Sequence, residues 1–270
     1  MGNDWLLVFF TAFAVTGAGM TVAASAGEER NAPAGVQLFV AAFALVCLAV
    51  GGLLSVLHLG RPELIFGALS NPGTGIFREF VTFALTAAAL VSYLILLLRS
   101  AEAGTTLWVA RIAAVSAVLL AASVGSAFVM PWRPAWNTWT LVLPYVGWCA
   151  AAAACARRLL LAAAKEDDPS GTLLTLGSIA LLAVLTAVYL AATVMTGGME
   201  AAVGRLIAGD LCAPFWGTVL VGMILPAGLV LIPGMKVIGS AAAIAAVFAG
   251  SALFQWIVQL LGTPSWHFFG

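Results

Sequence analysis

The chain has 270 residues, of which 63% are hydrophobic and only 8% are charged. Soluble domains carry about a quarter of their residues as charged side chains, so this composition excludes an ordinary water-soluble protein. Eleven basic residues balance eleven acidic ones without a basic stripe, which argues against nucleic acid as a partner. Long unbroken apolar runs such as 36–57 are unlike the short alternating segments of a membrane β-barrel. The fold class predicted is an all-α, polytopic membrane protein.

Apolar runs bounded by charged residues, Gly and Pro predict about eight membrane-spanning helices in a single helical bundle over residues 1–270. Residues 23–26 resemble a signal-peptide cleavage site, but no positive charge precedes the first run, so we interpret this run as a retained helix. Pro226 and Pro233 are expected to bend the seventh span. The spans are expected near 5–25, 36–57, 79–98, 106–129, 139–160, 172–195, 215–235 and 237–262.

Eight spans place both chain ends on one side of the membrane, which we call the N face. Near the predicted helix ends, four Lys and Arg residues lie on the N face and seven on the opposite face. The positive-inside rule therefore predicts that the N face lies outside the cytoplasm. Seven of the nine tryptophans also lie near the N face. A one-sided, Trp-rich surface is typical of a protein-docking face as well as of an aromatic belt.

Cysteine and histidine are too few and too scattered for a buried metal cofactor. The four cysteines show no CxxC or cluster-type spacing, and the two histidines, His58 and His267, lie outside the apolar runs. We therefore expect no iron–sulfur cluster, no haem and no metal site within this chain.

The connection between the second and third spans concentrates the ionisable residues. Gly60 and Pro62 end the second helix just after His58, and Arg78 and Glu79 open the third. If these helices pack antiparallel, His58 and Glu79 differ by about two residues in depth and can face a common pocket. Arg61 and Glu63 complete this cluster.

The chemistry of this cluster suits a quinol headgroup. A neutral imidazole donates or accepts a hydrogen bond and suits proton transfer, and a carboxylate near the membrane surface can pass a proton to water. The position of Glu79 at a helix N-terminus stabilises its charged form. The alternative is that these are ordinary interfacial residues and that His58 only caps its helix.

The connection between the second and third spans contains the motif His58-Leu59-Gly60-Arg61-Pro62, then Asn71, then Arg78-Glu79. This motif resembles that of a known family, the membrane anchor subunits of dimethyl sulfoxide reductases. A later loop, from Trp132 to Thr138, is similar to a Trp-containing loop of that family, and the eight-helix length agrees. Gly75-Ile76-Phe77 departs from the small polar residues that precede the Arg-Glu pair in the family. Anchors of the polysulfide and nitrite reductase type share parts of the motif.

The resemblance implies a function and partners. Anchors of this family contain no haem or metal and oxidise menaquinol near the outer membrane face. They pass electrons to a four-cluster iron–sulfur subunit, here expected on the extracytoplasmic face, which feeds a molybdopterin catalytic subunit. His58 matches the family's quinol-site histidine and Glu79 its quinol-site acid, so these two are the expected catalytic residues.

Further residues are candidates for contact with the quinol headgroup. Arg61 and Arg133 can alternatively bind the phosphates of membrane lipid, and the aromatic residues can serve belt or loop-packing roles. Arg111, inside the fourth span, is expected to extend to the cytoplasmic surface. The quinol-binding candidates, including the catalytic pair, are His58, Gly60, Arg61, Arg78, Glu79, Trp132, Arg133, Trp136 and Asn137.

Other functions remain open at this point. A polysulfide-reductase-type anchor and a non-catalytic structural anchor both fit the same layout. A small-solute transporter would show ionisable residues near the middle of the membrane and broken helices, and the former are lacking in the predicted spans. The chain is expected to reside as a multi-pass protein in a bacterial or archaeal cytoplasmic membrane.

Overall fold

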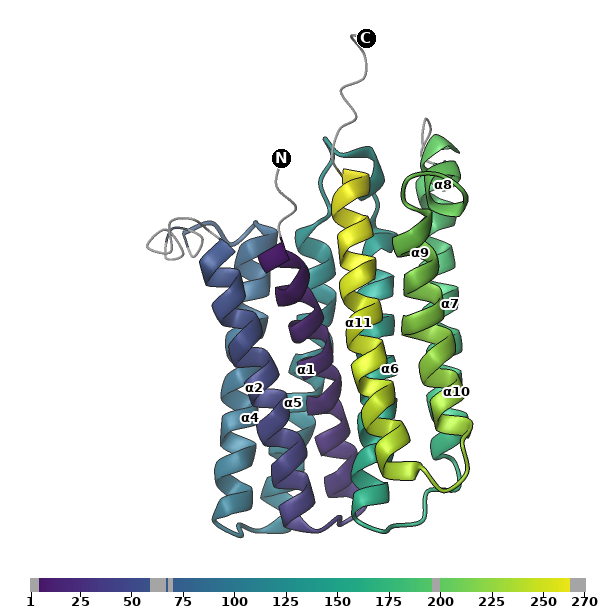
Figure 1. Cartoon of the computed structure of the whole chain (residues 1–270). Coiled ribbons are helices and arrows are strands. Elements are labelled where there is room, and N and C mark those ends of the chain that lie inside the picture. The colour runs from purple at the N-terminus through teal and green to yellow at the C-terminus, as the bar shows by residue number, and fades with distance from the viewer. Residues whose placement is uncertain (1–4, 59–66, 68–69, 196–199, 263–270) are drawn as a thin grey trace.

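A computed structural model describes residues 5–58, 67, 70–195 and 200–262 of the chain. Within these residues it contains helices and no strand, and eight helical spans are long and apolar enough to cross a membrane. The spans run side by side in one bundle (Figure 1). The protein is therefore an all-α, multi-pass membrane protein, as the composition predicts.

The eight predicted spans are confirmed, with ends that differ by a few residues. The first begins and the last ends at the same face of the bundle, the N face (Figure 1). The first six spans are α1 (Trp5–Glu29), α2 (Ala34–His58), α4 (Gly75–Leu98), α5 (Ala103–Ala127), α6 (Val142–Ala163) and α7 (Gly171–Met195). The last two are a composite of α9 (Cys212–Val219), η4 (Leu220–Ile224) and α10 (Leu225–Leu231), followed by α11 (Lys236–Gly262).

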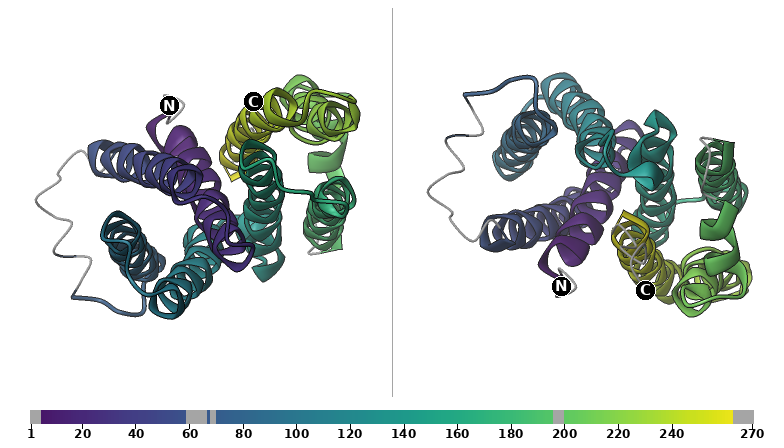
Figure 2. Two further views of the ribbon diagram at one scale, coloured as in Figure 1. Left: turned by 90° about the horizontal axis from the view of Figure 1, so that it is seen from below. Right: turned by 90° about the horizontal axis from the view of Figure 1, so that it is seen from above.

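Helix α1 occupies the centre of the bundle and packs against α2, α5, α6 and α11 (Figure 2). Small residues permit this close packing. A Cβ atom added to Gly19 would lie 2.6 Å from the Cβ of Ala152 on α6. Most of α1 is consequently buried in protein rather than exposed to lipid.

The seventh span is interrupted by a π-helical turn, η4. The N–H of Leu225 bonds to the carbonyl of Leu220, and Pro226, which follows, has no N–H to continue the α-helical pattern. Pro226 was predicted to bend this span, and the structure places a π turn directly before it. The prediction for Pro233 is wrong, because α10 ends at Leu231 and Pro233 lies in the following turn.

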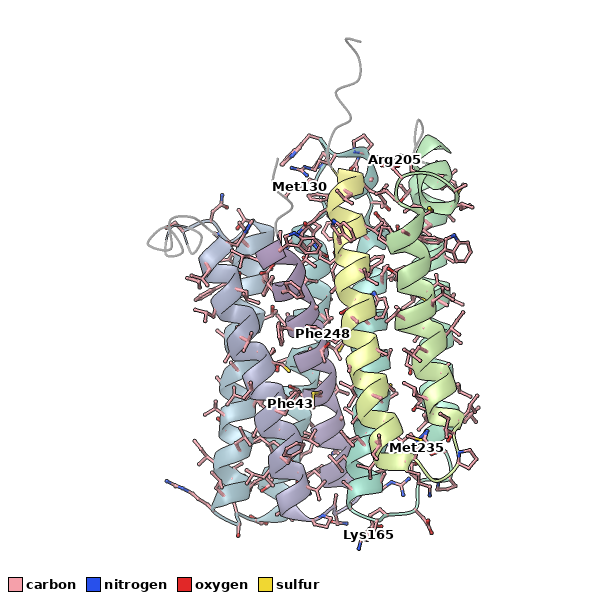
Figure 3. The ribbon with its side chains drawn as sticks, in the orientation of Figure 1. Phe43, Met130, Lys165, Arg205, Met235 and Phe248 are labelled. Carbon is pink, nitrogen blue, oxygen red and sulfur yellow. The ribbon has the colours of Figure 1, made fainter. Side chains whose placement is uncertain are left out.

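Charged residues gather at the two faces of the bundle, with Arg205 at the N face and Lys165 at the opposite face (Figure 3). Arg111 forms a 3.0 Å ion pair with Glu29, and the two side chains are 44% and 49% exposed. It is therefore not a buried functional cation, in agreement with the prediction that it extends to the surface. Arg157 forms a more buried pair with Asp168, at 2.7 Å.

The connection between α7 and α9 lies at the N face (Figure 1). It contains a further short helix, α8 (Glu200–Ile207). Arg205, in its last turn, forms two hydrogen bonds with the carboxylate of Asp210, at 2.9 and 2.7 Å. These bonds lower the pKa of Asp210 below its ordinary value.

Candidate functional site

His58 and Glu79 lie at similar depths on neighbouring antiparallel helices. Further from the N face, α2 and α4 are in contact at Gly52 and Phe83. A Cβ atom added to Gly52 would lie 3.0 Å from the ring of Phe83. His58 is six residues beyond Gly52 toward the N face, and Glu79 is four residues beyond Phe83. At 1.5 Å per residue these rises are about 9 and 6 Å, so both residues lie toward the N-face ends of their helices.

His58 is the last residue of α2, and its side chain is partly buried. Gly60, Arg61 and Glu63 follow His58 in the chain and lie outside the described residues.

The start of α4 is fixed by a cap and by close contact with α5. The hydroxyl of Thr74 accepts a 3.2 Å hydrogen bond from the N–H of Phe77 and donates one of 2.9 Å to the carbonyl of Asn71. At Gly75 the backbone of α4 meets Ala127, the last residue of α5. The glycine that departs from the family pattern therefore allows the two helix ends to touch.

Glu79 lies on the face of α4 that is turned toward α5 and α6. Gly75, Glu79 and Thr82 are spaced by four and three residues, which places them on one face of the helix. Thr82 forms a 2.5 Å hydrogen bond with Ser123 of α5. Glu79 itself is partly buried and lies within electrostatic range of Tyr145 on α6.

Arg78 points away from this face. Its side chain is exposed, and its guanidinium lies 5.8 Å from the ring of Trp139 in the short helix η3 (Trp139–Leu141). Adjacent residues on a helix are about 100° apart, which accounts for the divergence from Glu79. The structure thus places Arg78 beside the loop that follows α5, at the surface of the N face.

Arg133 and Trp136 fasten this loop to the end of α11. The indole N–H of Trp136 donates to the carbonyl of Val258 at 2.7 Å, and Arg133 donates to the carbonyl of Gly262 at 3.0 Å. The guanidinium of Arg133 also lies 4.3 Å from the centre of the Trp136 ring. These contacts satisfy helix-end carbonyls, so both residues have packing roles.

Trp132 and Asn137, the remaining candidates of this loop, are exposed. The Trp132 side chain is 74% exposed, whereas Trp136 is 5% exposed. The side-chain hydrogen bonds described for these loop candidates are those of Arg133 and Trp136, and both are made to α11 rather than to α2 or α4. The ring of Trp132 is therefore exposed at the N face.

Sequence reasoning missed two buried polar residues, Tyr145 and Gln255, of which Tyr145 lies within electrostatic range of Glu79. Tyr145 on α6 donates a 2.5 Å hydrogen bond to Oε1 of Gln255 on α11. Its ring is stacked on that of Phe128, with ring centres 6.0 Å apart. A polar residue inside an apolar run was the available signal, but the sequence does not show that α6 and α11 are neighbours.

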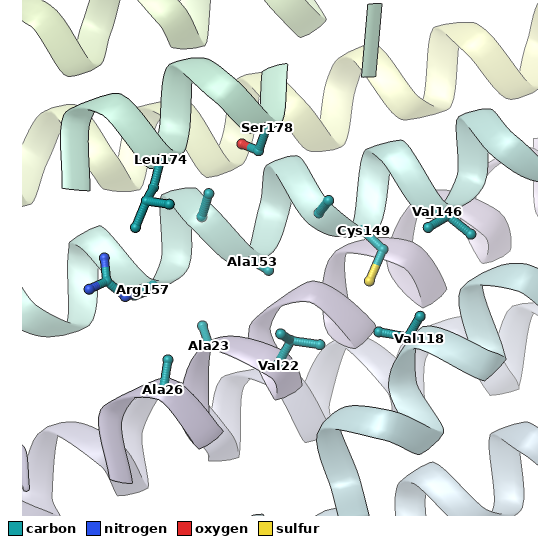
Figure 4. Close-up of a pocket in the computed structure, with 12 residues that line it drawn as sticks. Val22, Ala23, Ala26, Val118, Val146, Cys149, Ala153, Arg157, Leu174 and Ser178 are labelled. Carbon is teal, nitrogen blue, oxygen red and sulfur yellow. The ribbon is translucent and has the colours of Figure 1, made fainter. Parts of the chain in front are cut away.

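An apolar groove of about 320 Å³ lies along the side of α6 (Figure 4). It extends from Val146 to Arg157, toward the face opposite His58 and Glu79. Arg157 is held by Asp168, so its charge is already paired. The groove offers few polar groups and is a poor match for a quinol headgroup.

A scan against models of known protein families and a search of curated proteins both find no match to this chain.

Proposed function

We propose that this protein is the quinol-oxidising membrane anchor of a respiratory molybdopterin oxidoreductase resembling dimethyl sulfoxide reductase. The observation that carries the proposal is the similar depth of His58 and Glu79 at the N-face ends of two adjacent helices. Ionisable residues are rare in this chain, and these two provide the groups that quinol oxidation needs. The proposed location is a bacterial or archaeal cytoplasmic membrane, with the N face outside the cytoplasm.

The proposed reaction removes two electrons and two protons from menaquinol, which becomes menaquinone. The imidazole of His58 accepts one proton from a quinol hydroxyl, and the carboxylate of Glu79 accepts the other. The electrons pass to a four-cluster iron–sulfur subunit and from there to a molybdopterin catalytic subunit. Both proton acceptors lie close to the N face, so the protons are released on that side.

Exposed tryptophans support the N face as the docking surface for the iron–sulfur subunit. Trp132, Trp139 and Trp216 are 74%, 64% and 46% exposed, and each lies in or beside an N-face connection. Aromatic residues commonly anchor protein–protein interfaces. Placing the electron acceptor on this face also keeps it close to His58 and Glu79.

The proposal is tested by purifying the complex and measuring cluster reduction by a menaquinol analogue. The His58→Ala and Glu79→Gln variants are each expected to retain the partner subunits and to lose about 100-fold or more in rate, since one proton-transfer group typically contributes about 10²–10⁴-fold. Glu29→Gln, which removes an exposed carboxylate at the opposite face, serves as the control with an unchanged rate.

Two results would overturn the proposal. One is a normal rate of quinol-dependent reduction in the His58→Ala complex, which would indicate a structural anchor. The other is purification of the chain without an iron–sulfur protein and a molybdenum subunit, which would favour a different class of membrane protein.

A further inference from the structure

Within the described residues, two buried tyrosines donate a hydrogen bond to the side-chain oxygen of a glutamine. Near the opposite face, Tyr93 on α4 donates to Gln37 on α2. The amide nitrogen of Gln37 is also satisfied, because it donates to the carbonyl of Ala32 at 2.6 Å. Near the N face, Tyr145 on α6 forms the corresponding bond with Gln255 on α11.

In the Tyr145–Gln255 pair, the hydrogen bonds of the glutamine are incomplete. The side chain of Gln255 is fully buried, at 0% exposure, yet its Nε2 has no hydrogen-bond partner among the residues that the structure describes. Nε2 of Gln259 and Nε1 of Trp256 are also buried and unpartnered, and both lie within one turn of Gln255. Leaving buried N–H groups unpaired is costly, particularly inside a membrane.

These three unpartnered groups on α11 are all N–H donors, so the missing group is a hydrogen-bond acceptor. Gln255 and Gln259 are four residues apart, a rise of about 6 Å along the helix. One water oxygen that accepts a bond of about 2.9 Å from each amide spans this separation. The ring of Trp256 packs against Trp5 of α1 at 5.2 Å, so the donors lie where α1, α6 and α11 meet.

We propose that bound water occupies this junction of α1, α6 and α11. Of this water, one molecule accepts a hydrogen bond from the indole of Trp256, and another accepts hydrogen bonds from the amides of Gln255 and Gln259. It continues the Tyr145–Gln255 hydrogen bond toward the N face, because Gln259 lies one turn closer than Gln255 to Gly262 at the end of α11. Water fits this site because it is small and can accept two hydrogen bonds while donating two more.

Radiolytic hydroxyl-radical labelling of the full chain in lipid nanodiscs tests the site directly, since radicals formed from bound water modify buried side chains next to it. Tyr145 and Tyr93 are 1% and 0% exposed, so they form a matched pair. Tyr145 is expected to be labelled several-fold faster than Tyr93. Equal labelling of the two tyrosines in the unmodified protein would overturn the proposal.

Substitutions at the glutamines test whether the water lies at the proposed junction. The double substitution Gln255→Leu and Gln259→Leu is expected to reduce the labelling of Tyr145 to the level of Tyr93, whereas Gln37→Leu leaves Tyr145 unchanged. Undiminished labelling of Tyr145 in the folded double variant would refute the assigned site. If that variant fails to fold, the comparison in the unmodified protein decides. Labelling requires no quinol or partner subunit, so its outcome is separate from that of the His58→Ala experiment.

Discussion

Gly75, the first residue of α4, touches Ala127, the last residue of α5. A Cβ atom added to Gly75 would lie 2.7 Å from the Cα of Ala127, closer than such atoms approach in folded proteins. The contact is between backbones, so neither side can yield by rotating a side chain. Because Glu79 lies one turn further along α4, this contact fixes the position of the proposed catalytic carboxylate relative to α5 and α6.

Replacing Gly75 with Val is expected to displace the start of α4 and to lower the stability of the protein by about 1–3 kcal/mol, as overpacking commonly does. Quinol-dependent activity should fall as well, since Glu79 moves with the helix. Gly177→Ala on α7 is the matched control, because nothing lies within 4 Å of a Cβ atom added there. Thermal unfolding in detergent and cluster reduction measure the two effects, and an unchanged Gly75→Val variant would contradict the described contact.

Trp136 and Trp132 are expected to respond differently to the same substitution. Trp136→Leu removes a buried ring and its bond to Val258, and should cost about 3 kcal/mol of stability. Trp132→Leu removes a ring that is 74% exposed, and should change stability by no more than about 0.5 kcal/mol. Unfolding midpoints compare the two variants. Trp132→Leu should instead weaken retention of the iron–sulfur subunit during purification if that subunit docks on the N face.

Asp168→Asn is expected to destabilise the protein by about 3–5 kcal/mol, because it leaves the guanidinium of Arg157 buried without its counter-charge. The side chains of this pair are only 16% and 9% exposed. Asp210→Asn breaks a pair of similar geometry at the surface, where solvent screens the interaction, and should have little effect. Equal unfolding midpoints for the two variants would show that burial does not govern the strength of these pairs.

The helical spans were predictable because each depends on a local property, the hydrophobicity of about 20 consecutive residues. The similar depth of His58 and Glu79 follows from their positions at the N-face ends of two consecutive antiparallel helices, so it too was accessible from sequence. The divergence of Arg78 from Glu79 required only the geometry of one helix, which separates neighbouring side chains by about 100°.

Contacts between distant spans were not predictable in the same way. Trp136 bonds to Val258, a residue 122 positions further along the chain, so its burial could not be distinguished from interfacial exposure by sequence. The same holds for Tyr145 and Gln255, whose separation of 110 positions hides their hydrogen bond. Hydrophobicity predicts which segments enter the membrane, but the packing of small residues determines which of these segments are in contact.

Because α1 lies at the centre of the bundle, its high hydropathy does not mean that it tolerates large apolar substitutions. Although α1 has the composition of a lipid-facing span, 72% of its most apolar window is buried against other helices. Replacing Gly17 or Gly19 with leucine would raise the apolar character of the segment and still favour its insertion. The same changes would force α1 away from Leu48 on α2 or Ala152 on α6. Variants of this helix should therefore reach the membrane and fail at assembly of the bundle.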